Sequence, residues 1–137
     1  MTATKVWGST ECLFSCPLYS RHRLEVLPGG YSSIHYHANR ANRFHVETGT
    51  IAIVVFRAWR YERVILTQDT CYDVPSLVPH QFQCVEGGIV YEEYWRDRGG
   101  EVREDDIVRL TVGGYAAIDE LPDLVPRLMA DQVGDEP

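Results

Sequence analysis

Basic residues are scarce relative to acidic ones in this chain. Of its 137 residues, 13 are Lys or Arg and 20 are Asp or Glu, which gives a formal net charge of −7. This balance disfavours nucleic acid or an anionic membrane as the main partner, because both attract positively charged proteins. Hydrophobic residues make up 45% of the chain, an ordinary share for a folded domain.

Long apolar runs and internal repeats are missing from the sequence as well. No run approaches the ~20 apolar residues of a membrane span. Segment 1–7 has no apolar stretch before a cleavage site, so we expect no secretory signal and a cytoplasmic protein. With no repeat or linker visible, residues 1–137 are expected to form one domain. The four cysteines are interpreted as unpaired core or surface residues, as is usual in a reducing compartment: Cys12, Cys16, Cys71 and Cys84.

β-Branched and aromatic residues, separated by Gly and Pro, fill the first two-thirds of the chain. The pattern predicts strands over 23–27, 32–37, 42–47, 50–59, 63–66, 72–75, 81–85 and 88–95. Short strands at this spacing favour a β-sandwich or a small barrel. After Trp95 we expect a charged loop. The apolar spacing over 121–129 then predicts a short helix that Pro126 would interrupt.

Two of the five histidines form His35-Tyr36-His37. On a strand their side chains share one face with Cα atoms ~7 Å apart, so both rings can ligate one ion. A third ligand must come from elsewhere in the fold. His80 follows a rigid segment between Pro75 and Pro79, which can present its side chain inward.

These residues resemble the two sequence motifs of the cupins. The first resemblance covers 29–49 and the second 69–84, and weaker similarity to the small cupins related to mannose-6-phosphate isomerase extends to 6–8, 91–95 and 105–110. The residues that carry it are Gly29, His35, His37, Asn42, Gly49, Asp69, Pro75, Leu77, His80 and Cys84. Asn42 stands where the family usually has Glu, and Asp69, Leu77 and Cys84 also depart from the motif.

The resemblance implies an all-β fold, a double-stranded β-helix or jelly-roll barrel, with a short C-terminal helical tail at 115–137. It implies a divalent metal ion (Zn, Mn, Fe, Co or Ni) held by His35, His37 and His80, with Asn42 as the fourth candidate ligand. An amide is neutral and binds transition metals more weakly than a carboxylate. We therefore expect an exchangeable metal, or an anionic substrate that completes its coordination.

Other polar residues near the motifs have expected roles. Glu92 and Glu93 are adjacent on one strand, so one points inward, where it can act as a general base. Ser33 shares the face of His35 and is a candidate hydrogen-bond partner. Arg40 either reaches an anionic substrate at the barrel mouth or is solvated, and we expect the second. His22 is expected to be a surface or already satisfied histidine. His45 has the wrong parity to face the barrel interior.

Three functions fit this reading of the sequence. The first is a metal-dependent enzyme on a small polar molecule, with sugar or sugar-phosphate isomerisation as the family analogy. The second is an iron-dependent dioxygenase of the three-histidine type. The third is a non-catalytic, ligand-binding cupin. By the same analogy we expect a homodimer.

Overall fold

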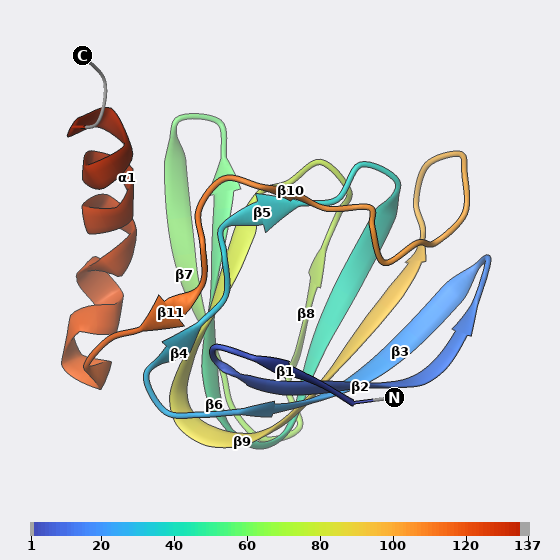
Figure 1. Ribbon diagram of the computed structural model, residues 1–137, viewed down its shortest axis with the longest axis horizontal. Helices are drawn as coiled ribbons and strands as arrows, with labels where there is room; N and C mark the ends of the chain where they lie inside the picture. Colours follow the sequence, from blue (N-terminus) through green and yellow to red (C-terminus); the bar gives the residue numbers. More distant parts are fainter. Residues whose placement is uncertain (1, 135–137) are drawn as a thin grey trace.

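The computed structural model describes residues 2–134, most of which lie in strands (Figure 1). The elements in chain order are β1 (Thr2–Lys5), β2 (Gly8–Cys16), β3 (Tyr19–Val26), β4 (Gly30–Tyr31), β5 (His35–Tyr36), β6 (Arg40–Arg57), β7 (Arg60–Leu66), β8 (Cys71–Val74), β9 (His80–Arg96), β10 (Val108–Arg109), β11 (Gly114–Tyr115), the 3-10 helix η1 (Ile118–Asp123) and the α-helix α1 (Leu124–Gly134). The all-β class with a short C-terminal helix, predicted from the sequence, is confirmed.

The two long strands β6 and β9 form the centre of one curled antiparallel sheet. They pair from Arg40 opposite Arg96 to Val55 opposite His80. β8 and then β7 pair along β6, and β3 pairs along the second half of β9. β2 and β1 extend the sheet beyond β3. Because the partners change along each long strand, the sheet curls around an interior (Figure 1).

Each long strand unites two segments that the sequence predicted as separate strands. Gly49 interrupts the expected pattern, but β6 continues through it with φ +91 and a shifted register against β9. Opposite it, a Cβ on Gly88 would lie 2.0 Å from the backbone oxygen of Thr48. The glycines therefore let two strands bend together at close approach instead of ending them. The strands β1 and β2 lie outside the predicted set.

The interior changes from apolar to polar along one face of β6. Phe44, Val46, Ile51 and Ile53 are each at most 1% exposed and belong to the main core. Burying a side chain of this size is worth about 1.5–3 kcal/mol. Asn42 continues the same face and is 0% exposed, so it is the first polar residue beyond the core.

The C-terminal helix begins late enough to accommodate Pro126, contrary to the expected interruption. Pro126 is the third residue of α1, where a backbone N–H has no acceptor within the helix. Val125 packs against Ile34 and Val54, so the helix covers the outside of the sheet. Of the expected tail, residues 135–137 lie outside the described part of the chain. Within residues 2–134, no helix is long and apolar enough to cross a membrane.

Candidate metal centre and its cavity

The three predicted histidines meet inside the barrel. His35 lies on β5 opposite His80 at the start of β9, and His37 follows two residues after His35. The ring centroids are 5.1 Å apart for His35 and His37, 4.6 Å for His35 and His80, and 5.2 Å for His37 and His80. All three side chains are buried, and their candidate ligand atoms lie within 4.8 Å of one another.

Backbone oxygens fix the tautomer of each ring. The Nδ1 atom of His35 lies 2.9 Å from the backbone oxygen of Ser33. The Nδ1 atom of His37 lies 2.7 Å from the backbone oxygen of Asp106, and that of His80 lies 2.9 Å from the backbone oxygen of Val78. A carbonyl only accepts, so Nδ1 carries the proton and Nε2 keeps its lone pair. The buried Nε2 atoms of His37 and His80 have no hydrogen-bond partner among the described residues. The cluster therefore fits a metal ion, whose binding would satisfy these atoms.

The protein environment keeps the cluster neutral, which is the form that binds metal. Burial lowers the pKa of His37 to about 3, with further lowering by Arg40 and His80. Burial likewise lowers the pKa of His80 to about 4, and Arg40 adds to the effect. The pKa of His35 is held well below its usual value by burial and by the two neighbouring rings.

Arg40 is part of the site, and its expected solvation is wrong. The side chain is 4% exposed, and its guanidinium carbon lies 3.8 Å from the centroid of the Tyr94 ring. Its Nε is 3.3 Å from Nδ1 of His37, a longer contact than the one from that Nδ1 to Asp106. Stacking on an aromatic face and a nearby carboxylate offset the cost of burying this charge.

That carboxylate belongs to Glu92, which is 9% exposed. Nδ2 of Asn42 donates a hydrogen bond to Oε2 of Glu92 at 2.9 Å, and the Tyr94 hydroxyl also hydrogen bonds to Glu92. Burial raises the pKa of Glu92, while these hydrogen bonds and the charge of Arg40 oppose the rise. The other amide atom of Asn42, Oδ1, is buried and has no partner among the described residues.

The structure separates the two candidate acids. Glu92 lines the cavity, whereas Glu93 points to the other face of β9 and accepts a hydrogen bond from the Tyr19 hydroxyl. Strand alternation predicted that only one would face inward, and the geometry leaves Glu92 as the candidate. Ser33 lies where the sequence predicted, with its hydroxyl 2.9 Å from Nδ1 of His35.

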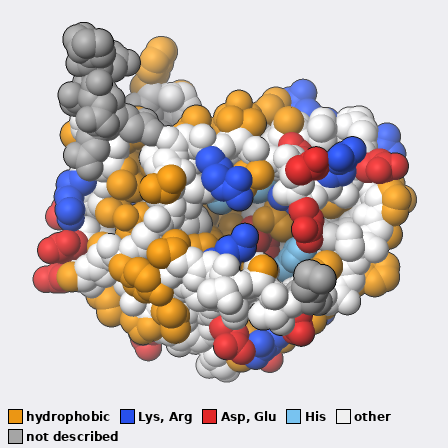
Figure 2. All heavy atoms as spheres, in the orientation of Figure 1, with side chains coloured by type: hydrophobic (Ala, Val, Ile, Leu, Met, Phe, Trp, Pro, Cys, Tyr) orange, Lys and Arg blue, Asp and Glu red, His pale blue; other side chains and the backbone are white. Residues whose placement is uncertain are grey.

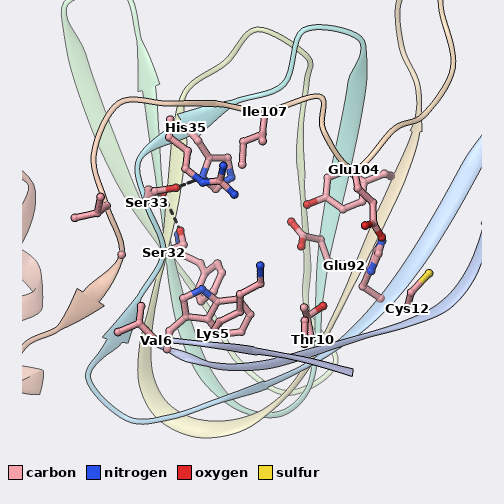
Figure 3. A pocket seen from close by; sticks show the side chains of 18 of the residues that line it. Lys5, Val6, Thr10, Cys12, Ser32, Ser33, His35, Glu92, Glu104 and Ile107 are labelled. Carbon is pink, nitrogen blue, oxygen red and sulfur yellow. Dashed lines mark hydrogen bonds between the residues drawn. The ribbon is translucent and has the colours of Figure 1, made fainter. Parts of the chain in front are cut away.

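An open cavity of about 470 Å³ reaches the site from the surface. Figure 2 shows the hollow, with basic side chains at its rim and histidine visible inside. Lys5, Arg40 and Arg109 contribute positive charge to its lining, and Glu92 and Glu104 contribute negative charge. Figure 3 shows His35 on one side and Glu92 with Glu104 on the other.

Sequence reasoning missed several lining residues. His22 is 8% exposed and lines the cavity, so its expected surface position is wrong; its Nε2 has no hydrogen-bond partner among the described residues. The apolar Leu24 and Val26 have the same parity on β3, and this alternation was the signal that His22 faces inward. No comparable sequence pattern indicated that the backbone oxygen of Asp106 accepts a hydrogen bond from His37.

The sequence of this chain is similar to part of two curated proteins. No family model matches the chain. Mannose-1-phosphate guanylyltransferase of Klebsiella pneumoniae is 27% identical over 104 residues, which are 76% of this chain and 21% of that protein. The Escherichia coli protein of that name is 27% identical over 106 residues, with the same shares. The chain thus spans about a fifth of the length of these curated relatives.

Several solved structures share the fold. A mutant of Bacillus subtilis oxalate decarboxylase superposes with a TM-score of 0.70 at 14% identity, over 80% of this chain and 30% of that chain. The Lactobacillus farciminis oxalate decarboxylase formate complex gives 0.68 at 14% identity, over 80% and 33%. CapF with the inhibitor 3-isopropenyl-tropolone gives 0.66 at 15% identity, over 82% and 34%.

These neighbours are cupins, and the fold of this chain is accordingly a jelly-roll cupin barrel. Three neutral histidines are gathered inside this barrel, and their ligand atoms lie close enough together to hold a metal ion. The cluster supports a divalent metal ion of unspecified identity.

Proposed function

We propose that the protein is a metal-dependent enzyme that isomerises a small polar carbohydrate, a sugar or sugar phosphate, in this cavity. His35, His37 and His80 hold the divalent ion, which supplies Lewis-acid polarisation of a substrate oxygen. Asn42 is the candidate fourth ligand, since its buried Oδ1 has no other partner among the described residues. The observation that carries the proposal is the nearly buried carboxylate of Glu92, which faces the same cavity.

Glu92 is suited to move a proton. Burial raises the pKa of its carboxyl, which makes the carboxylate a stronger base. In an aldose–ketose interconversion it takes the proton from the carbon next to the carbonyl and returns it to the former carbonyl carbon. The hydroxyl proton on the first of these carbons moves to the carbonyl oxygen, so the composition does not change. The hydrogen bonds from Asn42 and Tyr94 hold the carboxylate in place. The Tyr94 ring also contacts His37, with centroids 5.3 Å apart, which connects the base to the metal cluster.

The charge of the site favours an anionic substrate. Three neutral imidazoles and an amide leave the charge of a divalent ion uncompensated by its ligands. The basic side chains of the cavity lining also outnumber the acidic ones: Lys5, Arg40 and Arg109 against Glu92 and Glu104. The curated relatives are named for mannose 1-phosphate, which supports a sugar phosphate as the substrate class.

The test uses two adjacent acids as a matched pair. Metal-loaded protein is incubated in D₂O with pentoses, hexoses and their phosphates, and NMR follows isomer formation and deuterium uptake at carbon. Loss of general-base catalysis in Glu92→Gln is expected to lower the rate about 10²–10⁴-fold with metal content unchanged, whereas Glu93→Gln keeps wild-type activity. Absence of both isomer and deuterium uptake in fully loaded wild-type protein overturns the proposal and favours a non-catalytic, ligand-binding cupin.

A dioxygenase of the three-histidine type is the second candidate. The observation in its favour is that the histidine cluster includes no carboxylate among the described residues, in contrast to the common two-histidine, one-carboxylate iron site. This chemistry requires iron and consumes O₂. Bound zinc or manganese without oxygen uptake by the iron-loaded protein would exclude it.

A further inference from the structure

A second cluster of metal-binding side chains lies in the cavity, away from the three histidines. It consists of Cys12 on β2, His22 on β3 and Glu104 in the segment between β9 and β10, with candidate ligand atoms within 4.8 Å of one another. Figure 3 shows Cys12 and Glu104 across the cavity from His35. No step of the proposed isomerisation uses these residues.

The sheet itself brings the first two residues together. Cys12 pairs directly with His22 in the β2–β3 register, and both side chains line the cavity. Directly opposite residues on one face have Cβ atoms about 4.5–5.5 Å apart. His22 is 8% exposed, and its buried Nε2 has no hydrogen-bond partner among the described residues. A buried, unpartnered ring nitrogen next to a thiol and a carboxylate requires an explanation.

We propose that Cys12, His22 and Glu104 form a second divalent-cation site of the zinc type. A thiolate, an imidazole and a carboxylate are the three kinds of ligand that zinc takes, whereas calcium and magnesium take oxygen ligands. Three protein ligands leave the fourth tetrahedral position free for water or a substrate oxygen from the cavity. The two anionic ligands also balance the charge of the ion, which the histidine cluster does not.

Closure of the site requires a small movement of Glu104. Metal–ligand bonds of about 2.0–2.3 Å in a tetrahedron separate the ligand atoms by ~3.3–3.8 Å, so distances of up to 4.8 Å between the ligand atoms contract by up to ~1.5 Å on binding. Cys12 and His22 are held by the sheet, while Glu104 is exposed on segment 97–107 and supplies the movement. The same segment carries Asp106, whose backbone oxygen accepts from His37. Metal at the second site therefore also fixes the segment that orients the first.

Cobalt distinguishes the two sites, because only the second contains sulfur. Full-length protein, kept reduced with a phosphine, is titrated with Co²⁺, and thiolate-to-cobalt charge transfer is followed in the near ultraviolet. We expect two equivalents bound with this band in wild type, and one equivalent without it in Cys12→Ser. Cys16→Ser, on the same strand, is the control and keeps both. Glu104→Gln is expected to weaken the second equivalent more than tenfold, and the exposed Glu101→Gln to leave it unchanged.

The possible results separate this proposal from the proposed function. A single equivalent that retains the band supports the second site and contradicts metal binding by the histidines. Absence of the band in wild type at saturating Co²⁺ overturns the second site, and so does a band that persists in Cys12→Ser. Circular dichroism of each variant establishes that the fold is retained.

Discussion

Replacing Asp106 with Ala tests how the loop after β9 supports the metal cluster. The Asp106 carboxylate accepts hydrogen bonds from the backbone N–H of Ala38 at 2.8 Å and of Asn39 at 2.9 Å, while its backbone oxygen accepts from Nδ1 of His37. Hydrogen bonds to an ionised group contribute about 1.5–3 kcal/mol each, and partial exposure puts these two near the lower end. We expect Asp106→Ala, which removes both, to lower the free energy of unfolding by about 3 kcal/mol.

The same substitution should weaken metal binding. Without the carboxylate, the Asp106 backbone is no longer fixed against the segment that carries His37, and groups that orient metal ligands are worth about 10–100-fold in affinity. Urea unfolding and competition with a chromophoric chelator measure the two effects. The control is the neighbouring Asp105→Ala, which removes only a solvent-exposed pair with Arg103. Equal metal affinity in both variants would refute the role given to Asp106.

Three further outcomes follow from single contacts. Gly88→Ala places a Cβ 2.0 Å from the Thr48 backbone oxygen and should lower the free energy of unfolding in urea by at least about 2 kcal/mol. The control Gly99→Ala has nothing within 4 Å of its Cβ and should change that free energy by less than about 0.5 kcal/mol. Equal effects of the two substitutions would contradict the close approach of β6 and β9. Arg109→Gln should weaken binding of an anionic sugar about tenfold, or about 1.4 kcal/mol, and leave a neutral analogue unaffected, as calorimetry can measure. Burial raises the pKa of the Cys84 thiol to about 11, so its reactive thiolate is scarce at pH 8 and increases only as the pH approaches that pKa. A thiol reagent should therefore modify the exposed Cys71 first and Cys84 only after denaturation. Equal rates of modification in the folded protein would contradict this.

Period-two alternation was the sequence signal that predicted the site best. It predicted His35 and His37 on one face and Glu92 and Glu93 on opposite faces, because successive side chains of a strand point to opposite sides of the sheet. It could not predict that β6 runs through Gly49 without a break, since a glycine is compatible with both a turn and a bend. The close approach of β9 makes the chain bend at Gly49, and this approach is a property of the tertiary fold.

Long-range contacts explain what the sequence did not predict. Burial of Arg40 depends on the Tyr94 ring and Glu92, both more than fifty positions away along the chain. Glu104 approaches Cys12 and His22 only because the segment after β9 folds back over β2 and β3. Neither contact leaves a local pattern in the sequence. The homodimer and the cytoplasmic location stay predictions.

Anomalous diffraction from crystals of protein purified without chelator and then soaked in manganese or zinc tests the metal centre most directly. A peak is expected about 2.0–2.2 Å from the Nε2 atoms of His35, His37 and His80 together. Well-ordered imidazoles with no anomalous peak among them, at saturating metal, would contradict the assignment of this cluster as the metal site.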